Sequence, residues 1–181
     1  MSEPATEFSR IVRCEEIGDA PFTREIVAEA PERDALARRF GIESLDHLSA
    51  TVTLERRRSG LFRLDGHVSA TLTQLCVVSL EPVKQEVDET FSLYYAQPGR
   101  DPRESRAGTE VELSLDDEDW PEPAVDGRID IGEAVAQQVA LAIDPYPRAA
   151  GAVIENLPDE HRANEPSDNP FRALEGLGKP R

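Results

Sequence analysis

The alternation of side chains between residues 61 and 76 constrains the fold more than any other feature of the sequence. A period of two residues is typical of a β-strand with one buried face, because successive side chains point to opposite faces of a sheet. The run therefore predicts a long strand in a sheet with one face in water. Its apolar or small parity comprises Phe62, Leu64, Gly66, Val68, Ala70, Leu72 and Cys76.

Neighbouring runs extend this strand into a meander. Residues 48–55 alternate in the same way, and a polar turn ending in Gly60 separates them from the long strand. A third alternating run, residues 87–95, follows the break at Pro82. The middle of the chain therefore predicts an antiparallel meander. Two shorter strands are expected upstream, within residues 11–17 and 22–30.

Two segments carry helix signals. Pro31 at the first turn of a helical pattern predicts a short helix over 32–40. Asp130, with an acidic residue three positions later, resembles a capping box, and apolar residues then recur at helical spacing until Pro145. This pattern predicts a second helix over 131–143.

These elements indicate an α+β fold. We expect an antiparallel twisted sheet or open barrel of about five to seven strands, with the second helix packed on its apolar face. Residues 1–148 are interpreted as a single domain, with an acidic, proline-interrupted loop near 98–124. Residues 149–181 are expected to form a flexible tail.

The tail ends in a short segment, residues 169–178, with docking character. Its apolar residues recur at intervals of three, as on one face of a short helix, and such a face can dock in a groove of its own domain or of a partner. Docking on its own domain, docking on a partner and a frayed segment all remain open as interpretations. The residues concerned are Asn169, Pro170, Phe171, Leu174 and Leu177.

The charge balance restricts the partners. The chain holds 20 Lys and Arg against 36 Asp and Glu, a formal net charge of −16, which repels phosphate backbones and anionic lipid alike. There is no apolar run of about 18 residues and no secretion signal at the start of the sequence, so we expect a cytoplasmic protein without membrane attachment. Cys14 and Cys76 are expected to be free thiols.

The known sequence patterns of catalysis do not occur. We find no phosphate loop, dinucleotide fingerprint, nucleophile elbow or paired-histidine zinc helix. His67 falls on the polar face of its strand, and Cys76 falls on the apolar face as a small core residue. The run Asp116–Asp119 is interpreted as a solvated acidic loop, with a divalent-ion site as the alternative. We therefore expect no catalytic residue, cofactor, metal or small-molecule substrate.

One basic cluster stands out in this acidic chain. Arg56, Arg57 and Arg58 occupy the predicted hairpin turn, where their side chains can project outward. They are candidates for contact with phosphate or with an acidic partner, and the alternative is a solvated turn.

Four segments, in a fixed order, carry a family resemblance. They are 75–83, 91–95, 129–147 and 169–177, within a region of roughly 45–178. Together they resemble the YceD family, also called large ribosomal RNA subunit accumulation protein or domain of unknown function 177. The motif residues are Cys76, Leu80, Glu81, Pro82, Asp130, Asp144 and Pro145.

The resemblance implies a bacterial cytoplasmic protein needed for normal accumulation of 23S ribosomal RNA, with no established enzymatic activity. Many relatives carry a Cys-x-x-Cys at the strand end, where this chain has Cys76 and Ser79. This departure favours the absence of a zinc site.

Resemblance and charge together suggest how such a protein acts. Our first hypothesis is that it binds a basic ribosomal protein or a large-subunit precursor, with charge speeding the encounter. The alternative is direct contact with 23S precursor RNA through Arg56–Arg58 and the polar sheet face. A third class, an RNA-processing enzyme, needs an acidic metal site or a cofactor loop.

Overall fold

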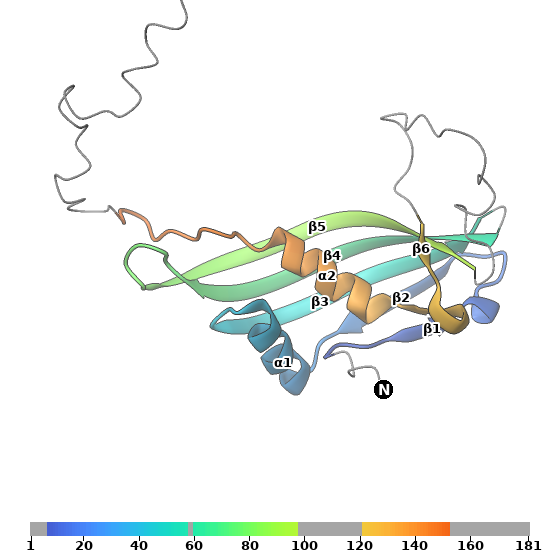
Figure 1. The fold of residues 1–181 in the computed structure, drawn as a ribbon, viewed down its shortest axis with the longest axis horizontal. Helices are drawn as coiled ribbons and strands as arrows, with labels where there is room; N and C mark the ends of the chain where they lie inside the picture. Colours follow the sequence, from blue (N-terminus) through green and yellow to red (C-terminus); the bar gives the residue numbers. More distant parts are fainter. Residues whose placement is uncertain (1–6, 58–59, 98–120, 153–181) are drawn as a thin grey trace, which may run out of the picture. The chain divides into compact units, whose positions relative to one another are not determined.

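The computed structural model describes residues 7–57, 60–97 and 121–152 (Figure 1). Its main sheet has the strand order β2-β3-β4-β5-β6. The first four strands pair antiparallel with their neighbours, whereas β6 pairs parallel with β5. The strands are β2 Phe22–Val27, β3 Ser44–Arg56, β4 Leu61–Leu75, β5 Pro82–Ala96 and β6 Glu122–Pro123.

The predicted α+β class and meander are confirmed, and the sheet is open, which agrees with the twisted-sheet form of the prediction (Figure 1). Three details differ. The sheet is mixed rather than antiparallel because the long connection after β5 lets β6 return in the same direction. A separate two-stranded sheet pairs β1, Ile11–Arg13, with β7, Arg128–Asp130. The first upstream strand is shorter than expected, since Cys14–Glu16 form a 3-10 turn.

Helix α1 spans Ala30–Phe40 and begins two residues before the predicted start. The Glu29 N–H donates to the Glu32 carboxylate at 2.8 Å, and this contact sets the first turn around Pro31. The helix ends at Gly41, which adopts φ of 68°. Neither helix in the described ranges is long and apolar enough to cross a membrane.

Helix α2 spans Ile131–Ala142, within one residue of the prediction. Asp130 is its N-cap, as expected, and its carboxylate accepts the backbone N–H groups of Gly132 and Glu133. Glu133 does not complete the anticipated capping box. Its carboxylate instead accepts a hydrogen bond from Arg39 at 2.6 Å and thereby ties α2 to α1.

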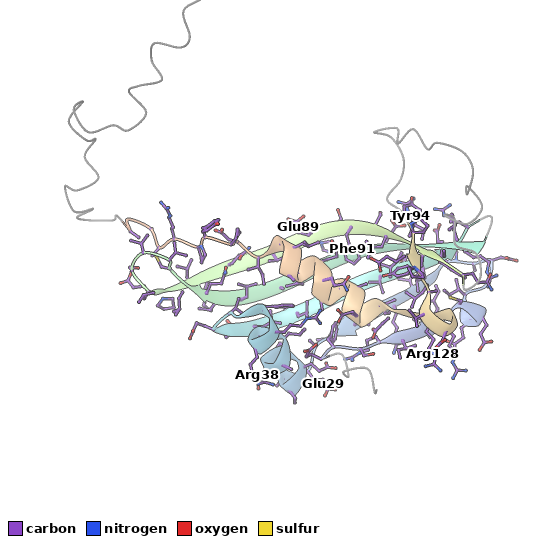
Figure 2. The ribbon with its side chains drawn as sticks, in the orientation of Figure 1. Glu29, Arg38, Glu89, Phe91, Tyr94 and Arg128 are labelled. Atoms are coloured by element: carbon purple, nitrogen blue, oxygen red, sulfur yellow. The ribbon has the colours of Figure 1, made fainter. Side chains whose placement is uncertain are left out.

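The core lies between α2 and the apolar face of the sheet. Helix α2 packs against β4, β5 and β1, while α1 packs against β3. Phe91 of β5, labelled in Figure 2, lies across Gly66 of β4, where a Cβ atom would overlap the ring. The opposite face of the sheet is polar and carries no helix of the described residues.

The chain divides into compact units over residues 1–149 and 150–181. Of the second unit, the structure describes only residues 150–152. The predicted docking segment 169–178 and most of the predicted acidic loop, including Asp116–Asp119, therefore lie outside the described residues.

Candidate functional site

The turn between β4 and β5 contains the densest part of the motif. The Cys76 N–H donates to the Glu81 carbonyl at 2.8 Å, and the Leu80 N–H donates to the Cys76 carbonyl at 3.0 Å. Leu80 has φ of 60°, in the left-handed region that leucine rarely adopts. The hydrogen bonds that close the turn thus hold Leu80 in a strained conformation.

The sulfur of Cys76 lies at the centre of this turn. Cys76 is buried, as the strand pattern predicts, and it is not part of a disulfide. The backbone N–H groups of Ala149, Ser79 and Val78 donate to it at 3.2, 3.3 and 3.4 Å. Donors to sulfur favour the thiolate, so Ala149 first and Ser79 next lower the pKa of Cys76 to about 6. The sulfur therefore joins two backbone segments instead of facing solvent.

The segment that follows α2, residues 143–149, lies along this turn, and we name it the strap. Two glutamines of the sheet hold its beginning. Gln74 Nε2 donates to the Asp144 carbonyl at 2.9 Å, and the Asp144 N–H donates to Gln85 Oε1 at 3.1 Å. The structure thereby brings most of the motif to one end of the sheet, namely Cys76, Leu80, Glu81, Pro82, Asp144 and Pro145.

Large apolar side chains are exposed on the turn and the strap. Leu80 is 71% exposed and Tyr146 is 72% exposed, and Leu75 and Val77 are exposed as well. The Val77 N–H donates to the Pro147 carbonyl at 2.9 Å, so the strap and the turn are held together. Exposed apolar residues that gather in this way mark interaction sites. This end of the sheet is suited to docking an apolar surface of a partner.

In the part of the chain that the structure describes, no group of three His, Cys, Asp or Glu side chains is placed to hold a metal ion. Ser79 stands where the second thiol of a Cys-x-x-Cys pattern would lie, and its hydroxyl donates to the Glu81 carboxylate at 3.2 Å. His67 is exposed, and its Nε2 lies 3.0 Å from Asp88 Oδ1.

The basic triplet lies away from this turn, at the β3–β4 connection. Arg56 donates to the backbone carbonyls of Ile17 and Cys14 at 3.1 and 3.0 Å. Its guanidinium also lies 5.3 Å from the centre of the Phe62 ring. Arg57 pairs with Glu55 at 2.8 Å, and Arg58 lies outside the described residues. The charge of Arg56 is therefore used to hold the segment after β1.

Asp130 is the motif residue that lies apart from the turn. Besides capping α2, its carboxylate accepts the Arg10 N–H at 2.8 Å and the Ser9 hydroxyl at 2.6 Å. It thus fixes the start of α2 against the N-terminal segment. The motif residues are divided between the two ends of α2.

A family model described as large ribosomal RNA subunit accumulation protein YceD matches residues 64–178, more than half of the chain. The chain belongs to the YceD family. Its description assigns the family a role in the accumulation of large-subunit ribosomal RNA. The matched region contains the turn, the strap and α2. No curated protein and no solved structure matches the chain.

Sequence reasoning missed the glutamines that hold the strap. Gln74 shares the apolar parity of Leu72 and Cys76, and a polar residue at a core position is a signal that it binds a specific partner. Gln85 gave the same signal, because it shares the parity of Val87 and Phe91, but its partners, Ala142 and Asp144, are far away in the sequence.

Proposed function

We propose that this protein is a non-enzymatic ribosome-biogenesis factor that acts in the cytoplasm and binds a basic ribosomal protein or a large-subunit precursor. By doing so it supports accumulation of 23S ribosomal RNA and assembly of the large subunit. The observation that carries the proposal is the exposed apolar group on the turn and strap, within the region that the YceD model covers. The net charge of −16 adds long-range attraction toward a basic protein.

The contacts of the arginine triplet also favour a protein partner over bare RNA. Arg56 donates to backbone carbonyls, and Arg57 is paired with Glu55. The open sheet face carries exposed carboxylates such as Glu86 and Asp88, which repel phosphate. Direct binding of 23S precursor RNA is the alternative that the experiment below separates.

The proposal is tested by purifying the tagged, full-length protein from its own cells, with and without ribonuclease, and identifying the bound proteins and RNA. We expect a basic large-subunit ribosomal protein to remain bound after ribonuclease. Leu80→Ser and Tyr146→Ser should each reduce its recovery, by roughly fivefold or more, because each removes an exposed apolar contact. Val27→Ser is the matched control, since Val27 is 50% exposed on β2, away from the turn.

Two outcomes would contradict the proposal. If 23S precursor RNA is recovered and every ribosomal protein is lost with ribonuclease, direct RNA binding is favoured. If no ribosomal component is recovered with the wild-type protein, the proposed function fails.

A further inference from the structure

A pocket lies at the end of the sheet opposite the turn. Its volume is about 520 Å³, and it is bounded by β1, the end of β5, β6, β7 and the first turns of α2. Arg128, labelled in Figure 2, marks this end of the molecule. Of the motif residues, Asp130 alone lines this pocket. The proposed contact at the turn lies at the other end of the sheet.

The wall of the pocket is acidic. Four carboxylates line it, against Arg128 as the basic residue of the lining. Glu133 is paired with Arg39, and Asp130 is bonded to Ser9 and to backbone N–H groups. The other two carboxylates, Glu122 and Asp126, have no ion-pair partner within the described ranges, and both are exposed.

A largely buried tyrosine also lines the pocket. Tyr95 is only 7% exposed, and its hydroxyl has no hydrogen-bond partner among the described residues. The hydroxyl is not one of the fully buried unpaired atoms, so it is accessible to a ligand that enters the pocket. Burial raises the pKa of Tyr95, and the charges of Glu122 and Asp130 raise it further. The charges of these carboxylates are therefore felt at the hydroxyl of Tyr95.

We infer that this pocket binds the guanidinium group of an arginine side chain from a basic peptide segment of the partner. A guanidinium has five N–H donors in one plane and can bond to several oxygen acceptors at once, which a lysine ammonium does less well. Glu122, Asp126 and the Tyr95 hydroxyl supply such acceptors. The exposed side chains of Val125 and Ile11, which also line the pocket, can contact the aliphatic stem.

This inference rests on the proposed function for the identity of the partner, because a basic ribosomal protein supplies the arginine. It adds a second contact to the one at the turn. Strand β5 has 15 residues, so at about 3.3 Å per residue the two ends of the sheet are roughly 45 Å apart. The two contacts can therefore be altered independently.

The experiment is a calorimetric titration of the full-length protein, at low ionic strength, with an amidated pentapeptide that contains two arginines separated by alanine. Control peptides carry lysine or uncharged citrulline in place of arginine. We expect the arginine peptide to bind several times more tightly than the lysine peptide, and the citrulline peptide to show no measurable binding.

The variants locate the binding site. The double variant Glu122→Gln, Asp126→Asn should raise Kd about tenfold or more, and Tyr95→Phe should raise it about threefold or more, since the phenylalanine removes only the hydroxyl. Glu86→Gln with Asp88→Asn, on the open sheet face, is the control of equal charge change. It should leave Kd within about twofold.

Equal Kd values for the wild-type protein and the pocket variants would overturn the inference, and so would equal binding of the arginine and lysine peptides. These titrations do not depend on any ribosomal component. If the peptide binds in the pocket but the wild-type protein recovers no ribosomal protein from cells, the proposed function fails and the arginine site stands. If recovery succeeds but the pocket variants bind the peptide normally, the arginine site alone fails.

Discussion

The two ends of the sheet differ in how they are built and in what they present. The turn and strap expose apolar side chains, and backbone hydrogen bonds to Cys76 and between the two segments fix them. The pocket end presents carboxylates and the hydroxyl of Tyr95, gathered from β5, β6 and the start of α2. The difference teaches that a motif within a short stretch of sequence can indicate a contact surface. A surface assembled from distant segments cannot be recognised from such a motif.

Each end also holds one residue other than glycine with positive φ in the described ranges. These are Leu80 in the turn and Asp126 at the pocket. Aspartate tolerates the left-handed region because its short side chain bonds locally, whereas leucine does not. The strain is thus greater at the apolar end.

The largest effect is expected at the pocket end, from Gly132→Ala. A Cβ atom there would lie 2.5 Å from the Phe8 carbonyl oxygen and 2.9 Å from the Arg10 nitrogen, both backbone atoms. The free energy of unfolding should fall by about 2–3 kcal/mol, because the N-terminal segment must move away from α2. Urea denaturation followed by circular dichroism measures this. Gly18→Ala, with no atom within 4 Å of the new Cβ, should change it little.

Asp130→Ala should have the next largest effect. It removes the acceptor for the N–H groups of Gly132, Glu133 and Arg10, at a cost of about 1–2 kcal/mol of stability. Asp130→Asn keeps a good N-cap, so it should lose less than half as much stability as Asp130→Ala. Equal losses in the two variants, measured by urea denaturation, would show that the carboxylate acts through its charge rather than as a cap.

At the opposite end, Leu80→Gly should stabilise the protein, by about 1 kcal/mol, because glycine adopts φ of 60° without strain. The same variant should weaken recovery of the partner, since the apolar side chain is lost. Asp126→Gly is the matched change at the pocket, and it should increase the stability of the protein by less. If thermal denaturation shows Leu80→Gly to be destabilised, the side chain contributes packing that outweighs the strain.

The last prediction concerns a pH dependence at the turn. The pKa of Cys76 is about 6 in the folded protein, against an ordinary value of 9.0. Between pH 6 and 9 the thiol is protonated in the unfolded chain and ionised in the folded protein, so the unfolded chain binds more protons. The thiolate therefore contributes its full stabilisation above pH 9, and this contribution is lost as the pH falls through 6. Relative to Cys76→Ala, the wild-type protein should therefore gain stability from pH 6 to 9.

Denaturation in a reducing buffer at several pH values measures this difference. Cys14→Ala serves as the control, because burial raises the pKa of Cys14 and its removal should leave the rise intact. A wild-type protein and Cys76→Ala variant with parallel pH profiles would show that the sulfur stays a thiol.

The sequence by itself determined the local elements. The alternation over residues 61–76, the N-cap at Asp130 and the stop at Pro145 each depend on neighbours a few positions away, and such patterns predict strands and helix ends. The order of motif residues in the chain also sufficed to indicate the family.

Only the tertiary structure decided which segments meet. It placed the strap on the turn through Gln74 and Gln85, returned β6 parallel to β5, and bonded the guanidinium of Arg56 to backbone carbonyls. It also gathered the pocket from distant segments. The reason is physical: periodicity and capping are set by local geometry, whereas these contacts depend on long-range packing that no short stretch of sequence encodes.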